Sequence, residues 1–385
     1  MVSAPSVGSA GGRIGNGGIG SYHSPDMIWR QVRRLIRPFV KWGTVLSLTI
    51  FSLAACSLVE IEDAPLTTFE PAGPFAERID AIFWQVFWIA VVIFVVVEGG
   101  ILLIVLLFRD RKGRKEPRQI HGNNKLEITW TIIPALILTV IAIPTVQGVF
   151  ELTECDDDAM PVEIIGHQWW FEYRYPELGI ETGSVLAIPV DREVCAFMTS
   201  ADVLHNYWVP HLMGKRYLVP GQETTLKLQA DEPAEYWGHC AEFCGLSHSL
   251  MRARVVSMTQ ADFDAWAAAQ QQLAVPPEPD TPAAAGLKVF QEQGCTQCHT
   301  VDYGPDFAGT NLVADELYNG PNLTHFASRN VFAGAILPRE GQTHADGLRE
   351  WLANPPGVKP GSFMPDLDLT HQEIEDLIAW LDTLQ

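Results

Sequence analysis

Two long apolar stretches stand out in the hydrophobic pattern of the chain. Residues 81–108 are apolar except for Gln85 and Glu98, and residues 130–150 are apolar apart from a few threonines and one glutamine. Each stretch can cross about 30 Å of hydrocarbon at about 1.5 Å per residue. The pattern predicts a two-helix transmembrane hairpin over residues 81–150.

The segment between the two stretches is basic. Residues 109–125 contain seven lysines and arginines against two acidic residues. Positively charged loops stay on the cytoplasmic side of bacterial membranes. Both ends of the hairpin are therefore expected on the outer side.

Shorter apolar runs follow, separated by glycine, proline and aspartate. Their residue types and lengths are typical of strands, and we expect an antiparallel sandwich or barrel over residues 151–270. The expected strands are 162–166, 169–175, 185–189, 193–199, 223–230 and 251–258.

The last third of the chain has helical patterns. Residues 271–284 form a linker rich in proline and alanine, and residues 285–385 form a small all-α domain. Three helices are expected: one before Cys295, one around Leu348, and a last one that opens with a capping box of Thr370 and Glu373.

The N-terminus resembles an export signal. Five basic residues precede an apolar run, 42–55, that is too short to span a bilayer comfortably. The run closes on Leu-Ala-Ala-Cys56, which resembles a lipoprotein cleavage box with Cys56 as the lipidated residue; an uncleaved signal anchor is the alternative. Residues 1–55 are assigned to this extension and signal peptide, and 56–80 to a segment on the outer side. Met27 stands where an export signal would naturally begin.

The net charge of −20 argues against nucleic acid as a partner and suits a soluble face that meets cationic partners; simple solubility is the alternative. The seven cysteines are more informative, because two pairs are close in sequence: Cys240 with Cys244, and Cys295 with Cys298. Closely spaced cysteines point to metal or cofactor chemistry.

The first pair belongs to a dense group of metal donors. Cys240, Cys244, His248 and Met251 lie within twelve residues. Zinc does not need the thioether, whereas thiolate, imidazole and thioether together favour copper. A two-metal site needs a second imidazole, for which His205 is well placed; His211 and His239 are nearby alternatives.

These residues resemble subunit II of the haem–copper cytochrome oxidases and its binuclear copper centre, CuA. The resemblance runs from the hairpin to residue 260 and includes Gly166-His-Gln-Trp-Trp-Phe-Glu-Tyr173, Val203-Leu-His-Asn, and Cys-x3-Cys-x3-His-x2-Met. It implies a cupredoxin-like β-sandwich. By this likeness the copper ligands are His205, Cys240, Cys244, His248, Met251 and the backbone carbonyl of Glu242.

The same resemblance implies three further roles. The Glu242 carboxylate is expected to bind magnesium at the boundary with subunit I. Trp169 is the point at which electrons enter, and here it can serve the tethered domain instead of a diffusing donor. Glu127, at the cytoplasmic start of the second span, is either the mouth of a proton path or an ordinary interfacial carboxylate.

The second cysteine pair is a haem signature. Cys295-Thr-Gln-Cys298-His299 is the pattern of covalent c-type haem attachment, with His299 on the iron. Met364 is the methionine available as the other axial ligand; a bis-histidine site with His325, His344 or His371 is the alternative. The sequence from Gly320 to Leu323 resembles the cytochrome c loop whose proline carbonyl, here that of Pro321, orients the haem histidine. The domain as a whole is similar to the cytochrome c fused to some bacterial subunits II.

Cys155 and Cys195 belong to no ligand motif and lie on the oxidising side of the membrane. They either form a disulfide or remain two buried thiols.

The sequence thus predicts subunit II of a bacterial cytochrome c oxidase in the plasma membrane, with its copper and haem domains outside. Electrons would pass from an external cytochrome c or cupredoxin to haem c, then to CuA, then to an oxygen-reducing, proton-pumping subunit I, with subunit III as a further partner. Two alternatives are the copper subunit of a nitric oxide reductase and a stand-alone membrane-anchored carrier; the polar Gln85 and Glu98 within a span argue against the carrier.

Overall fold

The structure, a computed structural model, describes residues 65–109, 121–304, 307, 320–338 and 343–385, which all belong to the unit Pro65–Gln385. The predicted signal peptide, the lipidation candidate Cys56 and the central part of the basic loop lie outside the described residues.

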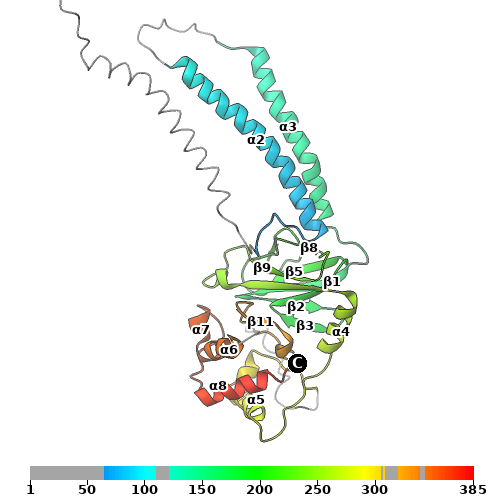
Figure 1. Cartoon of the computed structure of the whole chain (residues 1–385), viewed down its shortest axis with the longest axis vertical. Helices are drawn as coiled ribbons and strands as arrows, with labels where there is room; N and C mark the ends of the chain where they lie inside the picture. The colour runs from blue at the N-terminus through cyan, green and yellow to red at the C-terminus, as the bar shows by residue number, and fades with distance from the viewer. Residues whose placement is uncertain (1–64, 110–120, 305–306, 308–319, 339–342) are drawn as a thin grey trace, which may run out of the picture. The chain divides into compact units, whose positions relative to one another are not determined.

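Two long helices form the hairpin. Helix α2 covers Pro74–Phe108 and α3 covers Asn124–Glu151 (Figure 1). The mean hydropathy of their most apolar windows is 3.1 and 2.1, and the chain buries neither window. Both helices are therefore long and apolar enough to cross a membrane, and the predicted spans lie within them. An ion pair of 2.5 Å between Arg78 and Glu151 joins the two helices.

The next region is a sandwich of two five-stranded sheets. Strand order is β3-β2-β1-β5-β8 in one sheet and β4-β10-β9-β6-β7 in the other. The strands are β1 (Met160–His167), β2 (Trp170–Tyr175), β3 (Ile180–Gly183), β4 (Val185–Pro189), β5 (Val194–Ser200), β6 (His205–Trp208), β7 (Arg216–Leu218), β8 (Thr224–Leu228), β9 (Ala234–Cys240) and β10 (Arg252–Met258).

The sandwich is not purely antiparallel, so that prediction was wrong. Strand β1 pairs in parallel with β5, and β4 pairs in parallel with β10. The cause is a change of sheet: after β3 the chain passes through Ser184, at φ 68°, and continues as β4 in the other sheet. Strands that switch sheets at a bend make the corners of such sandwiches.

A disulfide joins Cys155 to Cys195, with the two Cα atoms 5.7 Å apart. Cys155 follows helix α3, and Cys195 is the second residue of β5. Of the two predicted alternatives, the structure contains the bonded pair. It links the end of the hairpin to β5, an inner strand of the first sheet.

Helix α4 (Gln260–Gln270) follows the sandwich and was not predicted; Phe263 and Ala267 are the buried residues that pack it against the core. The aromatic rings of Tyr175 and Trp266 lie 5.3 Å apart across this contact. The segment after α4 then leads to a second hydrophobic core.

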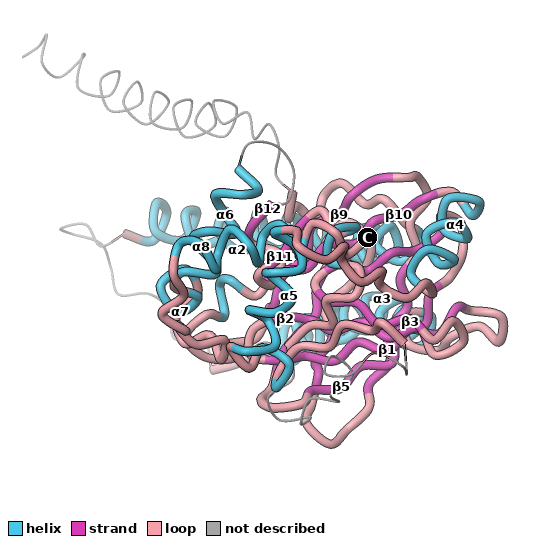
Figure 2. Tube along the Cα trace, turned by 90° about the horizontal axis from the view of Figure 1, so that it is seen from below, coloured by secondary structure: helices cyan, strands magenta, loops and turns pink. Residues whose placement is uncertain are grey.

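The last region is mainly helical. Figure 1 shows its helices α5, α6 and α8 below the strands of the sandwich, and Figure 2 shows the short strands β11 and β12 beside these helices. Gly286 of α5 packs directly on α8, where a Cβ would lie 2.0 Å from the carbonyl oxygen of Asp376, and the rings of Phe290 and Trp380 are 4.5 Å apart. The predicted capping box of Thr370 and Glu373 is present. The elements are α5 (Pro282–Glu292), 3₁₀ turns at Cys295–Gln297 and Phe326–Ser328, a hairpin of β11 (Val331–Phe332) and β12 (Leu337–Pro338), α6 (Thr343–Ala353), α7 (Pro355–Val358) and α8 (His371–Leu381).

Candidate functional site

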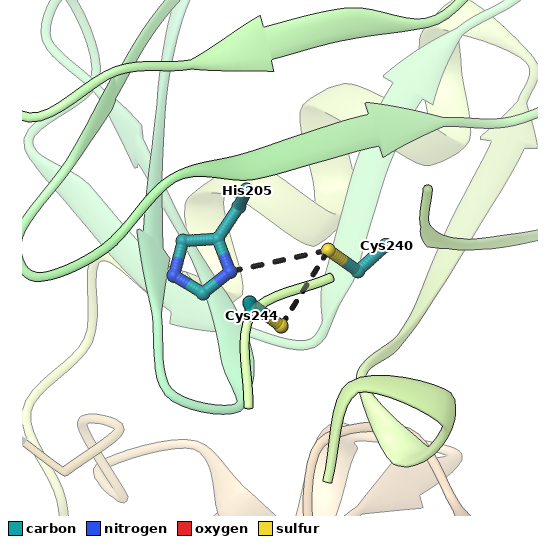
Figure 3. Close-up of side chains that lie close together, drawn as sticks. All are labelled: His205, Cys240 and Cys244. Atoms are coloured by element: carbon teal, nitrogen blue, oxygen red, sulfur yellow. Dashed lines mark hydrogen bonds between the residues drawn. The ribbon is translucent and has the colours of Figure 1, made fainter. Parts of the chain in front are cut away.

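Three donors meet at one end of the second sheet. His205 begins β6 and Cys240 ends β9, and these strands pair through Tyr207 and Cys240. Because side chains two residues apart share a face of a strand, His205 points to the same side as Tyr207 and Cys240. The Nδ1 atom of His205 is 3.9 Å from the sulfur of Cys240, which is 3.8 Å from the sulfur of Cys244 (Figure 3). All three residues are buried.

The loop after β9 adds the remaining donors. Nδ1 of His248 lies 3.6 Å from the sulfur of Cys244, and the thioether of Met251 lies 3.9 Å from the same sulfur. The carbonyl oxygen of Glu242 lies 3.2 Å from the sulfur of Cys240. The two sulfurs thus form a centre with one imidazole beside each. This soft, symmetric donor set fits a pair of copper ions.

The two cysteine sulfurs are within hydrogen-bond distance of each other. The hydrogen bond between them lowers the pKa of Cys240 and raises that of Cys244. A thiolate is therefore readily formed at Cys240, and metal binding would release the remaining proton.

Asp202 orients the histidine and was missed by the sequence analysis. Its carboxylate lies 2.8 Å from Nε2 of His205, which leaves Nδ1 facing the sulfurs. Burial would lower the pKa of His205, but the hydrogen bonds to Asp202 and Cys240 outweigh it and raise the pKa. The Asp-x-x-His spacing was the available signal.

The competing histidines lie elsewhere. Nδ1 of His211 is 2.8 Å from the carbonyl oxygen of Glu70, and the ring of His239 packs against Trp208 at 5.2 Å. Among the residues that the structure describes, neither of these two histidines belongs to the cluster around the two sulfurs.

The side chain of Glu242 is partly exposed beside Tyr217. A hydrogen bond with Glu242 raises the pKa of the Tyr217 hydroxyl. The carboxylate for which magnesium binding was predicted thus lies at the surface of the loop between Cys240 and Cys244.

Trp169 lies between the donor cluster and the last region of the chain. It is 6% exposed, and its indole nitrogen donates a hydrogen bond of 3.0 Å to the carbonyl oxygen of Cys244. Its ring stacks on Phe363, with the centroids 6.3 Å apart. Gln168 donates to the same carbonyl at 2.7 Å, a second support that sequence reasoning missed.

The haem signature lines a large cavity. The two cysteines and the histidine lie on its wall, and Met364 is also among its lining residues. His299 is one turn beyond Cys295, whose carbonyl accepts its backbone N–H at 2.9 Å. The cavity has a volume of about 340 Å³ and is mainly apolar, which fits a porphyrin held at its edge by two thiols.

The loop at Pro321 holds the haem histidine. Nδ1 of His299 lies 2.9 Å from the carbonyl oxygen of Pro321, so Nε2 is left for the iron. Burial lowers the pKa of His299, which keeps the ring neutral and able to act as a ligand. Gly320 makes this fit possible, because a Cβ there would lie 2.6 Å from the imidazole.

The three alternative axial histidines have other partners. Nδ1 of His325 is 2.8 Å from the carbonyl oxygen of Gln385, and Nε2 of His344 is 3.1 Å from Asp382. His371 is largely exposed. Among the described residues that line the cavity, Met364 is present and these histidines are not.

Glu127 lies in the first turn of α3, far in sequence from both donor sets. Its carboxylate accepts a hydrogen bond of 3.2 Å from the backbone N–H of Asn123, the residue that caps the helix. This local contact is compatible with both predicted roles of Glu127, the mouth of a proton path and an interfacial carboxylate.

Three family profiles match the chain: the transmembrane domain of cytochrome c oxidase subunit II at residues 65–147, its periplasmic domain at 178–258, and cytochrome c at 283–385. Cytochrome c oxidase subunit 2 of Alkalihalophilus pseudofirmus is 35% identical over 347 residues, which cover 88% of this chain and 95% of that relative. The chain belongs to the cytochrome c oxidase subunit II family. The corresponding protein of Bacillus sp. strain PS3 is 32% identical over 358 residues, covering 88% of this chain and 96% of the relative. The periplasmic domain of subunit II from Bradyrhizobium japonicum, a crystal structure, is 22% identical, with a TM-score of 0.30; it covers 31% of this chain and 97% of that chain.

This subunit II is therefore a component of an oxidoreductase complex, and a cytochrome c domain follows its copper domain. The two domain families imply copper and haem c as cofactors. The hairpin anchors the subunit in a membrane, with the soluble domains on the periplasmic side.

Proposed function

We propose that this subunit receives electrons at haem c and passes them through a binuclear copper centre to the oxygen-reducing subunit I. One observation carries the proposal. Trp169 bonds to the carbonyl of Cys244 on one side and stacks on Phe363, the neighbour of Met364, on the other. A single side chain thus contacts the loop of the copper donors and the residue next to the proposed haem ligand Met364.

The proposed copper ligands are the side chains of His205, Cys240, Cys244, His248 and Met251 and the carbonyl of Glu242. Copper, when bound, supplies a one-electron change of oxidation state. The protein contributes a buried cage whose histidine is fixed by Asp202 and whose loop is fixed by Gln168. Such a cage changes little in geometry on reduction, so the reorganisation energy of electron transfer stays small.

The proposed haem residues are Cys295, Cys298, His299 and Met364. Cys295 and Cys298 would hold the haem through thioether bonds, formed by addition of each thiol to a vinyl group without an oxidant. The Pro321 carbonyl holds Nδ1 of His299, so Nε2 would be the nitrogen available to the iron. With histidine and methionine as ligands the haem would supply one-electron chemistry at a high reduction potential, which suits a donor to an oxidase.

The remaining assignments extend this proposal. Subunit I binds the hairpin, subunit III completes the complex, and an external cytochrome c or cupredoxin reduces the haem. We place the complex in the bacterial plasma membrane, with Cys56 lipidated, magnesium on the Glu242 carboxylate and protons entering near Glu127. Membership of the oxidase family favours this reading over a nitric oxide reductase or a lone carrier.

The test uses the purified complex that contains this chain. We expect two coppers and one haem c per chain and oxygen consumption with a reduced donor. Cys244→Ser is expected to keep the haem, lose the mixed-valence copper spectrum and stop oxygen consumption, while Ser328→Ala leaves all three unchanged. A copper-free complex that consumes oxygen at the wild-type rate would refute the proposal. Consumption of nitric oxide but not oxygen would support the reductase, and a chain that purifies alone and is fully reducible would support the carrier.

A further inference from the structure

A buried lysine of the haem domain contacts the copper domain. Lys359 is 4% exposed, and its Nζ donates hydrogen bonds to the carbonyl oxygens of Trp169 at 2.5 Å and Ala333 at 3.0 Å. Trp169 immediately precedes β2, whereas Lys359 follows α7 and comes five residues before Met364. The contact therefore joins Trp169, which supports the loop of the copper donors, to the segment that carries the candidate haem ligand Met364.

Two more hydrogen bonds cross the same boundary at the copper loop. The hydroxyl of Ser247 donates to the carbonyl oxygen of Pro360 at 2.6 Å, and the backbone N–H of Arg252 donates to that of Gly334 at 3.2 Å. Ser247 precedes the ligand candidate His248, and Arg252 follows Met251. The haem domain thus rests on the loop that carries the copper donors.

Two glycines allow this close approach. Gly334 has φ 74°, and a Cβ there would lie 2.1 Å from Nζ of Lys359 and 2.7 Å from the carbonyl oxygen of Trp169. Gly361 has φ 80°, and a Cβ there would lie 2.7 Å from the indole of Trp169. Neither position has room for a Cβ atom, so the close packing around Trp169 requires glycine at both.

The ammonium needs partners from both domains. A buried ammonium without hydrogen bonds is costly, and burial lowers the pKa of Lys359 to about 7. One of its carbonyl acceptors, that of Ala333, belongs to the haem domain, and the other, that of Trp169, belongs to the copper domain. Separation of the domains would remove the second acceptor.

We propose that Lys359 is a positioning residue that holds the haem domain on the copper loop in the arrangement through which electrons pass. The inference rests on the proposed function and adds its internal geometry. The same docking covers Trp169 with Phe363, so electrons reach the copper from the tethered haem and not from a diffusing donor at Trp169.

The experiment follows electron transfer within the full complex. A photoexcited ruthenium complex delivers one electron to the haem, and absorbance then reports the oxidation of haem c and the reduction of copper. Lys359→Met removes the ammonium and keeps an unbranched, apolar side chain. Lys288→Met is the matched control, because Lys288 lies on α5 of the same domain and is 71% exposed.

We expect Lys359→Met to slow the step from haem to copper by about tenfold or more, since it removes two hydrogen bonds to backbone carbonyl oxygens. Reduction of the haem, its midpoint potential and the copper spectrum should match those of Lys288→Met. Gly334→Ala, which presses on the same ammonium and carbonyl, should slow the same step. If Lys359→Met fails to retain haem, the rate measured in Gly334→Ala tests the inference instead.

Wild-type rates in Lys359→Met and Gly334→Ala would overturn the inference. So would a slower step accompanied by a shifted haem potential, because the lysine would then act on the haem itself. A wild-type complex in which the reduced haem never passes its electron to copper would instead refute the proposed function.

Discussion

The carboxylate of Asp202 lies 2.8 Å from Nε2 of His205. The contact fixes the ring so that Nδ1 faces the sulfur of Cys240. Asp202 also accepts the backbone N–H of Gln168, at 2.6 Å, and so ties the histidine to the support of the copper loop.

Asp202→Ala should weaken copper binding about 10- to 100-fold, because loss of an outer partner frees the histidine ring. Competition with a copper chelator measures the affinity, and the near-infrared band reports the geometry of the centre. Asp158→Ala, at an exposed position of the same domain, is the control. Equal affinity in the two variants would show that Asp202 does not orient the ligand.

Glu172 should make the copper domain sensitive to acid. Burial raises its pKa, but the hydrogen bond to His167 and the charge of Arg174 outweigh burial, and the pKa lies below its usual value. A lowered carboxyl pKa contributes stability above the unfolded value of about 4.3, and this contribution is lost as the pH falls through the folded pKa.

Glu172→Gln should therefore cost about 3 kcal/mol at neutral pH, and its difference from wild type should shrink as the pH falls below about 4. Denaturant unfolding of the chain at several pH values measures this. Glu177→Gln, at an exposed position, should cost little at any pH. A cost that stays constant into acid would mean that packing, and not charge, explains the effect.

Gly320→Ala should disturb the haem histidine. Its Cβ would lie 2.6 Å from the ring of His299, so the imidazole must move away from the Pro321 carbonyl. We expect loss of the absorption band typical of methionine–iron bonding or a shift in the midpoint potential. Gly347→Ala in α6, where the new Cβ would meet Phe332 at an ordinary 3.4 Å, should leave both unchanged. An unchanged haem in Gly320→Ala would argue against His299 as the ligand held by this loop.

Loss of the Cys155–Cys195 disulfide should destabilise the copper domain. The bond closes a loop of 40 residues, for which chain entropy gives about 4 kcal/mol. The double variant Cys155→Ser, Cys195→Ser should unfold at lower temperature in calorimetry, and wild type under reducing conditions should behave in the same way. If oxidised wild type and the double variant unfold together, the bond adds no stability.

Local patterns revealed much of the site. Cys240, Cys244, His248 and Met251 lie in one loop, and Cys295, Cys298 and His299 in another, so their spacing alone reports their chemistry. His205 comes from a strand that propensity did not reveal, because His-Asn-Tyr-Trp has no clear alternation. It was identified from its place after the expected strand 193–199 and from the family resemblance.

Contacts between distant segments could not be predicted. Lys359 and Trp169 are 190 positions apart, and no periodicity connects them. The parallel pairing of β1 with β5 was missed for the same reason, since it depends on where the chain changes sheets. Helix α4 was missed because its apolar residues are mostly alanine, which gives a weak pattern.

The order of the two cofactor cages along the chain has a consequence for assembly. The strands and loop that hold the copper donors end at Met258, whereas the haem cavity needs α5, Met364 and α8 together. Domains fold as their residues emerge during synthesis, earlier ones first. The copper cage can therefore close before the haem pocket exists, and the platform on which Lys359 docks is ready when the haem domain arrives.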